Sequence, residues 1–246
     1  MATGKARLDK MVLDRGLVPS RERARALIMA GQVVVDDHVA DKAGQMVPVD
    51  ADIRLRGEPL PFVSRGGLKL QKALDEFRLD VSGLAVLDVG ASTGGFTDCL
   101  LQRGARKVFA VDVGYGQLAW KLRTDDRVVN LEKTNIRYLT SDGLPEIPDM
   151  AVIDASFISL AKVLPATVGL VRENGTIVAL IKPQFEVGRG EVGKGGVVRD
   201  ANKHREVTEA VCVLAESLGL DVLGVTESPI LGPKGNREFL ICLRKR

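Results

Sequence analysis

Residues 84–97 read LAVLDVGASTGGFT, and this stretch decides the fold of the larger part of the chain. An apolar run of strand length ends at Val89, and a glycine-rich turn leads from it into a helical pattern. Glycines at such a turn let a ligand approach the backbone closely, and the amino end of the following helix favours polar ligand groups. The stretch therefore predicts a nucleotide-type binding turn after the first strand of an α/β sheet.

Alternating strands and helices extend this turn into a sheet. Apolar runs of strand length are separated by helical stretches, which is typical of βαβ units and a parallel sheet. Two later strands are joined by the loop SPILGPKGN, which is too short for a helical crossover, so we expect that pair to be antiparallel. The fold class is thus α/β, with a Rossmann-like sheet that is mostly parallel and has its last strand antiparallel. The runs lie at 86–89, 108–111, 128–131, 150–153 and 176–181, and the later pair at 222–225 and 238–243.

A different pattern precedes this sheet. Apolar residues at helical spacing and a capping Ser20 predict two helices, and residues 33–39 predict a strand, a polar turn and a second strand. Two prolines then interrupt regular structure. We therefore expect a small α+β domain over residues 1–58, a linker over 59–64 and a catalytic domain over 65–246.

Basic side chains are concentrated at the start of the small domain. Residues 1–31 carry seven Lys/Arg and three Asp/Glu, whereas residues 32–60 carry three and six. Because the whole chain has a net charge of only +3, this asymmetry predicts a local contact with a polyanion, and a solvated helix surface is the alternative. The candidate residues for contact with RNA are Arg7, Lys10, Arg15, Arg21, Arg25 and Arg65.

The remaining composition argues against several classes of protein. Cys99, Cys212 and Cys242 are scattered, which disfavours a disulfide framework, and the start of the chain lacks a signal-peptide pattern. We therefore expect a cytoplasmic protein without stable membrane association, since no apolar run approaches the roughly 20 residues of a membrane-spanning helix. His38 and His204 lack metal-ligand neighbours, so we expect no metal site and ordinary surface or loop positions for both.

An acidic residue after the second strand narrows the choice of cofactor. Asp112 follows Gly90 by 22 positions, where a carboxylate is placed to bind ribose hydroxyls. NAD is the competitor, but the glycine spacing is not GxGxxG. The carboxylate of Asp88 would also repel a pyrophosphate while tolerating the amino and sulfonium groups of S-adenosylmethionine (SAM), so the sequence favours SAM. The candidate cofactor-binding residues are Asp88, Gly90, Ala91, Ser92, Gly94, Gly95, Phe96, Asp112, Val113 and Asn135, the last of which is equally consistent with a plain turn residue.

Charged side chains at strand ends suggest the chemistry. Asp154 and Lys182 end the fourth and fifth strands of the sheet, where reactive groups of open α/β sheets gather. A partly buried, neutral Lys182 suits a general base for a ribose hydroxyl, with Lys69 and Glu238 as further candidates. From spacing alone, ordinary surface salt bridges are equally consistent with these four residues.

Base methylation is the rival reaction. Carbon-5 methylation needs a nucleophilic cysteine, and no cysteine follows a strand end. Amine methylation typically uses an Asn/Asp-Pro-Pro-aromatic clamp, whereas residues 154–157 read DASF.

Several motifs together resemble one family. The chain is similar to the TlyA proteins, which join an S4-type RNA-binding domain to an FtsJ-like methyltransferase domain. FtsJ-like enzymes use a Lys-Asp-Lys-Glu tetrad for ribose 2′-O-methylation, and the matching residues here are Lys69, Asp154, Lys182 and Glu238. The motifs are RGGLKL at 65–70, DVGASTGGFT at 88–97, DVGYGQLAW at 112–120, SFIS at 156–159, KPQFEV at 182–187 and GNRE at 235–238.

The resemblance implies a substrate and leaves two alternatives open. It implies SAM-dependent methylation of cytidine in ribosomal RNA, as free RNA or a ribosomal subunit. Because the chain ends just after its last strand, it resembles the shorter TlyA form, for which large-subunit RNA alone is expected. The alternatives are a membrane-active hemolysin, after another name of the family, and an RNA-binding protein without methyltransferase activity.

Overall fold

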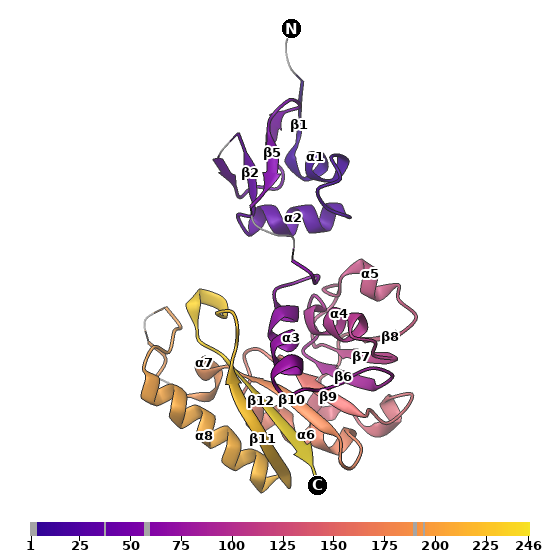
Figure 1. Ribbon diagram of the computed structural model, residues 1–246, viewed down its shortest axis with the longest axis vertical. Helices are drawn as coiled ribbons and strands as arrows, with labels where there is room; N and C mark the ends of the chain where they lie inside the picture. Colours follow the sequence, from indigo (N-terminus) through magenta and orange to yellow (C-terminus); the bar gives the residue numbers. More distant parts are fainter. Residues whose placement is uncertain (1–3, 37, 57–59, 189–190, 194) are drawn as a thin grey trace. The chain divides into compact units, whose positions relative to one another are not determined.

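The computed structural model describes residues 4–36, 38–56, 60–188, 191–193 and 195–246. The chain divides into two units, Met1–Pro61 and Phe62–Arg246, each with its own hydrophobic core (Figure 1).

The first unit combines two helices with short strands. The elements in chain order are β1 (Lys5–Arg7), α1 (Leu8–Asp14), α2 (Arg21–Met29), β2 (Val33–Val35), β3 (His38–Ala40), β4 (Met46–Pro48) and β5 (Ile53–Leu55). The Ser20 side chain accepts a hydrogen bond from the backbone N–H of Arg23, so the cap predicted for the second helix is confirmed. Leu8, Val12 and Ile28 are fully buried in the core between the helices and the strands.

The strand content of this unit exceeds the sequence-based expectation of one hairpin. The predicted hairpin is present as β2 and β3, and β5 pairs with the other edge of β2. A separate pair joins β1 to β4. Each of these additional strands has only three residues, which is too short to show a period of two in the sequence.

The second unit is built around a sheet of seven strands. Its elements are α3 (Gly66–Glu76), β6 (Ala85–Val89), α4 (Gly95–Gln102), β7 (Lys107–Val111), α5 (Trp120–Arg123), β8 (Val128–Leu131), η1 (Ile136–Tyr138), η2 (Ser141–Gly143), β9 (Met150–Ile153), α6 (Leu160–Leu170), β10 (Thr176–Ile181), α7 (Pro183–Glu186), α8 (Ala201–Ser217), β11 (Leu220–Glu227), η3 (Pro233–Gly235) and β12 (Phe239–Lys245).

The sheet order is β11-β12-β10-β9-β6-β7-β8, and β12 runs antiparallel to both of its neighbours while the other pairings are parallel. The predicted Rossmann-like α/β sheet with an antiparallel last strand is therefore confirmed. From β6 the chain proceeds outward to β7 and β8, and it later returns to place β9 on the opposite side. The gap between β6 and β9 is thus the topological switch point, at whose carboxyl edge ligands of such sheets bind.

Helices cover both faces of the sheet (Figure 1). On one face, α3 and α4 contribute Leu70 and Leu100 to a core that includes Val86 of β6. On the other, α6 and α8 pack against residues such as Leu87 and Ile153. Alternate residues of β6 thus face opposite helical layers, which explains why this strand is buried along its whole length and apolar at every position except Asp88.

One sequence-based expectation outside the site is wrong. His38 is exposed as expected, but His204 is buried within α8. Its Nε2 lies 2.9 Å from the carbonyl oxygen of Val198, and its ring lies 5.7 Å from the ring of Phe239. His204 therefore anchors the segment that precedes α8. No helix in the described part of the chain is long and apolar enough to cross a membrane.

Candidate active site

A cavity of about 450 Å³ opens at the switch point of the sheet. Its size falls in the range of small-molecule sites, roughly 300–1,000 Å³. Four segments form its walls: the start of α3, the glycine-rich turn, the ends of β9 and β10, and residues 230–232 before β12. The lining residues are Ser64, Arg65, Gly66, Lys69, Gly90, Ala91, Ser92, Thr93, Gly95, Phe96, Asp154, Ser156, Lys182, Ile230, Leu231 and Gly232.

The glycine-rich turn occupies one wall because its backbone approaches β9 closely. Gly90 has φ +85°, and a Cβ at this position would lie 2.9 Å from the carbonyl oxygen of Asp154. Any larger residue would push the turn away from the strand end. Of the predicted cofactor-binding residues, Gly90, Ala91, Ser92, Gly95 and Phe96 line the cavity, whereas Asp88, Gly94, Asp112, Val113 and Asn135 do not.

Asp88, predicted to bind the cofactor, is not among the residues that line the cavity. It is fully buried at the end of β6, and its Oδ2 accepts a hydrogen bond of 2.6 Å from the Thr97 hydroxyl. Its Oδ1 has no partner among the described residues. Burial raises the pKa of Asp88 to about 7, partly offset by the bond from Thr97. Asp88 thus links β6 to α4 beneath the turn.

Asp112 supports the turn from the neighbouring strand. Its Oδ2 accepts the backbone N–H of Ser92 at 2.8 Å, and its Oδ1 accepts that of Gly114 at 2.6 Å. The carboxylate therefore stands at the edge of the cofactor turn, at the tip of β7. Asn135 caps η1 by accepting the backbone N–H of Arg137, which favours the turn interpretation that the sequence left open. Val113 is exposed beside Asp112.

Lys182 is held at the end of β10 by three oxygens. Its Nζ lies 2.6 Å from Asp154 Oδ1 and donates to the Ser156 hydroxyl at 2.7 Å and to the Asp154 carbonyl at 3.4 Å. The residue is 6% exposed, so the predicted partial burial of Lys182 is confirmed. Ser156 was not predicted as a site residue, although it lies within the SFIS motif.

Lys69 forms a second ion pair at the same cavity. It projects from α3, and its Nζ donates to Glu238 Oε2 at 2.6 Å. Glu238 is buried directly before β12, and its Oε1 has no partner among the described residues. Glu238 thus pairs with Lys69. From the sequence, either Lys69 or Lys182 could have been its partner. Lys69, Asp154 and Lys182 face the same cavity, and Glu238 supports one of them from behind.

Residues 230–232 close the cavity on the β12 side. A Cβ added at Gly232 would overlap the carboxylate of Glu238, so the glycine allows this loop to lie directly against the Lys69–Glu238 pair. From the sequence, this segment was expected only to connect the last two strands. A loop conformation of this kind has no periodic signal from which it could be predicted.

An exposed aromatic residue directly follows the lining residue Ser156 in the chain. Phe157 is 89% exposed and adopts φ +63°, which is unusual for a bulky side chain. Its ring lies 5.1 Å from the ring of Phe185 in α7. The pair therefore presents an apolar face next to Lys182.

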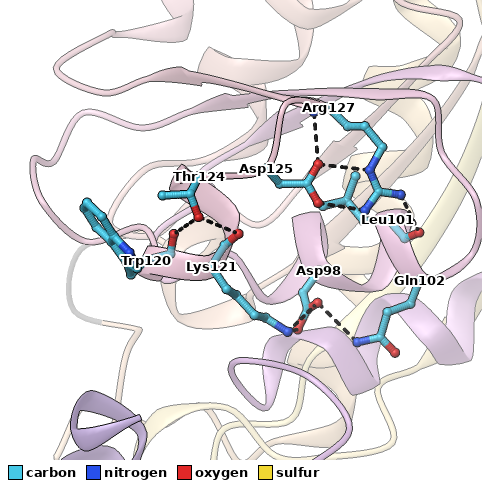
Figure 2. Close-up of polar contacts among 8 residues, drawn as sticks. All are labelled: Asp98, Leu101, Gln102, Trp120, Lys121, Thr124, Asp125 and Arg127. Carbon is cyan, nitrogen blue, oxygen red and sulfur yellow. Dashed lines mark hydrogen bonds and ion pairs between the residues drawn. The ribbon is translucent and has the colours of Figure 1, made fainter. Parts of the chain in front are cut away.

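The short helix α5 braces the cofactor turn from outside. The backbone N–H of Ala119, its N-cap, bonds to the Thr93 carbonyl at 3.1 Å. Figure 2 shows how α5 is tied to α4: the buried Asp98 accepts from Lys121 at 2.9 Å and from Gln102 at 3.1 Å. The carboxylate of Asp98 thus fixes the two helices that flank the turn.

The candidate RNA-binding residues of the first unit are largely engaged within that unit. Arg7, Arg21 and Arg25 converge on the buried Asp9. Arg15 donates to the backbone carbonyls of Ala51 and Val49 at 2.7 Å each, so part of its role is structural. The remaining two candidates differ: Lys10 is exposed on α1, and Arg65 is exposed and lines the cavity of the second unit.

Comparison with known proteins covers both units. The model of the FtsJ-like methyltransferase family matches residues 62–245, and that of the S4 domain matches residues 6–53. The 16S/23S rRNA (cytidine-2′-O)-methyltransferase TlyA of Mycobacterium tuberculosis is 48% identical over 98% of this chain and 90% of its own length. This chain belongs to the TlyA family.

Two further TlyA-family relatives carry hemolysin names. Hemolysin A of Brachyspira hyodysenteriae is 42% identical over 95% of this chain and 98% of its own length. A solved structure from Streptococcus thermophilus, provisionally named a hemolysin, is 47% identical with a TM-score of 0.78, over 99% of this chain and 90% of that one. The expected TlyA resemblance, the S4 domain and the methyltransferase class are therefore confirmed.

Proposed function

We propose that this protein transfers the methyl group of SAM to the ribose 2′-hydroxyl of a cytidine in large-subunit ribosomal RNA. The observation that carries the proposal is the pair of buried lysines, Lys69 and Lys182, on one cavity beside the glycine-rich turn. The named activity of the M. tuberculosis relative supports the nucleoside and the position of the methyl group.

The cavity fits SAM as the cofactor. The backbone of residues 90–93 is open to a ligand, and the carboxylate of Asp112 stands at the tip of β7, where it would hold ribose hydroxyls. SAM supplies an electrophilic methyl group when it is bound. We propose that the backbone of the turn would hold SAM in this cavity, which Lys182 also lines.

We propose that Lys182 removes the proton of the attacking hydroxyl. A ribose hydroxyl is a weak nucleophile, so a positioned base and correct alignment supply much of the rate. In its neutral form, Lys182 would accept the proton of the 2′-hydroxyl at Nζ, and SAM would supply the methyl group that the 2′-oxygen takes up. Asp154 and Ser156 hold the amine in place, and Asp154 compensates the charge that Lys182 gains.

Lys69 and Glu238 have a positioning role in this proposal. Their ion pair fixes Lys69 at the cavity that Lys182 also lines, where it would bind the ribose or a neighbouring phosphate. We further propose that the aromatic face of Phe157 receives the target base after it rotates out of its stack.

The cysteines favour the ribose over carbon 5 of the base. Carbon-5 methylation requires a thiolate at the reacting base, but no cysteine is among the residues that line the cavity. Burial raises the pKa of the Cys99 thiol to about 12 and that of the Cys242 thiol to about 11. Both therefore stay protonated near neutral pH.

The test is methyl transfer from labelled SAM to purified, unmethylated ribosomal subunits, assayed separately. The proposal predicts label on the large-subunit RNA. Because the M. tuberculosis relative is named for both RNAs, the small subunit is the informative comparison, and label on it would contradict the restriction to the large subunit. Absence of label from both subunits, with folded protein, would contradict the proposed function.

A further inference from the structure

One buried carboxylate in the first unit holds three arginines. Asp9 lies in the first turn of α1, and none of its side chain is exposed. Arg7 donates to it through Nε and Nη2 at 3.0 Å each, Arg21 through the same two atoms at 3.1 and 3.2 Å, and Arg25 through Nε at 3.3 Å. One negative charge is therefore shared by three positive charges, and the cluster stays positive.

The three arginines come from two elements, β1 and α2. Arg7 ends β1, Arg21 begins α2 and Arg25 lies one turn further along that helix. The guanidinium of Arg7 also packs over Gly44, since a Cβ there would lie 3.4 Å from Nη2. Three like charges at this spacing repel one another. The carboxylate of Asp9 is the common contact that holds them together.

The arginines are fixed but not covered. Their side chains are 44%, 47% and 56% exposed for Arg7, Arg21 and Arg25, whereas Asp9 is inaccessible. A guanidinium has five N–H donors, and Asp9 uses at most two from each arginine. Each arginine therefore keeps donors for a second oxyanion, and phosphate matches their planar geometry.

We infer that Asp9 is a positioning residue for RNA binding, which holds Arg7, Arg21 and Arg25 as one preformed site for RNA phosphate groups. This inference rests on the proposed function. Side chains that are ordered before binding lose less entropy when the RNA arrives, so the preformed cluster binds more tightly than three free arginines. The hydrogen bond from Arg7, with the charges of Arg7 and Arg21, keeps the pKa of Asp9 well below its usual range. The carboxylate therefore remains charged near neutral pH.

The sign of one mutational effect tests the inference. Asp9→Asn and Asp14→Asn each raise the net charge by one, but Asp14 is exposed at the end of α1 and is the matched control. The probe is an unmodified transcript of large-subunit ribosomal RNA, titrated with the full chain at several salt concentrations. Simple electrostatics predicts that both variants bind the transcript more tightly.

The inference predicts the opposite result for one of them. Asp14→Asn binds as tightly as the unmodified protein or slightly more tightly. Asp9→Asn binds about tenfold more weakly, with a shallower dependence on salt, because freed arginines must be ordered on binding. SAM affinity stays unchanged in both variants, since the cavity belongs to the other unit.

Equal RNA affinity of folded Asp9→Asn and Asp14→Asn would overturn the inference while leaving the proposed function intact. If Asp9→Asn fails to fold, the RNA affinity of Arg21→Lys tests the inference instead. Lysine keeps the positive charge, but it lacks the planar guanidinium with which arginine can contact Asp9 and a phosphate at the same time. The inference predicts weaker binding for Arg21→Lys, and unchanged binding would overturn it. Failure of the unmodified protein to bind the transcript would overturn both the inference and the proposed function.

Discussion

At the scale of single residues, the two lysines of the cavity differ in their surroundings. Lys182 contacts Asp154 and Ser156 at the cavity wall, whereas Lys69 has one buried partner, Glu238, behind it. Breaking a buried ion pair leaves an uncompensated charge and destabilises the fold. Loss of Glu238 should therefore affect both folding and activity. Loss of Lys182 should affect mainly the chemical step.

Replacement of Lys182 by alanine is expected to lower kcat for RNA methylation by about 10²- to 10⁴-fold, the usual contribution of a general base. Lys182→Arg should not restore activity, because a guanidinium stays protonated and cannot accept the proton. The measurement is single-turnover methyl transfer, with SAM affinity determined in parallel. Lys162→Ala, at an exposed position of α6, is the control and should leave the rate unchanged. Near-normal turnover of Lys182→Ala would contradict its role as the base.

The buried Asp88 is expected to make the free energy of unfolding decrease as the pH rises. Its folded pKa of about 7 lies above the ordinary value of 3.8, so between these values the folded state holds a proton that the unfolded chain has released. Stability contributed by this group therefore falls as the pH rises from 4 to 7. Asp88→Asn removes the unfavourable burial of a titrating carboxyl group. The free energy of unfolding of this variant, relative to that of the unmodified protein, should therefore increase by up to about 1.4 kcal/mol per pH unit between pH 4 and 7.

Denaturant unfolding at several pH values between 4 and 8 measures this difference. Asp142→Asn, in the exposed η2 segment, is the control and should show no such trend. A difference between Asp88→Asn and the unmodified protein that stays constant with pH would show that Asp88 is charged throughout.

At the scale of elements, the loop before β12 shapes the catalytic pair. Gly232→Ala is expected to displace Glu238 and with it Lys69, because the new methyl group would occupy the space of the carboxylate. We expect kcat to fall about tenfold or more, with a smaller effect on SAM affinity. Gly169→Ala in α6 is the matched control, since its Cβ meets no atom within 4 Å and alanine favours a helix. Equal activity of the two variants would contradict the positioning role of the loop.

The elements also show how far the sequence predicts this protein. The seven strands of the second unit follow from long apolar runs and their spacing, and all were expected. The short strands β1, β4 and β5 were not, because three residues carry no periodic signal. In the site, the motifs predict which residue types occur. The pairing of Glu238 with Lys69, and the burial of Asp88 between β6 and α4, depend on how these segments pack.

At the scale of the whole molecule, the two units separate RNA binding from methyl transfer in the proposed function. Each unit has its own hydrophobic core, so we expect thermal unfolding to show two transitions. SAM should raise the melting temperature of the second unit alone, since the cavity lies within residues 62–246. At 100 times its dissociation constant, a ligand stabilises the folded state by about 2.7 kcal/mol.

Differential scanning calorimetry with and without SAM measures this shift. Added NAD at the same concentration is the control for the choice of cofactor and should leave both transitions unchanged. A shift of the first unit by SAM, or of the second unit by NAD but not SAM, would contradict the assignment of the cavity.

The central claim is that the methyl group arrives on a ribose oxygen. The most direct measurement is to digest the product RNA after reaction with methyl-labelled SAM and to locate the label by mass spectrometry and alkali resistance. We predict label in the ribose of a single cytidine, at an alkali-resistant linkage, with at least about 100-fold slower labelling in a Lys182→Ala reaction. Label on a base, at an alkali-sensitive linkage, would contradict it.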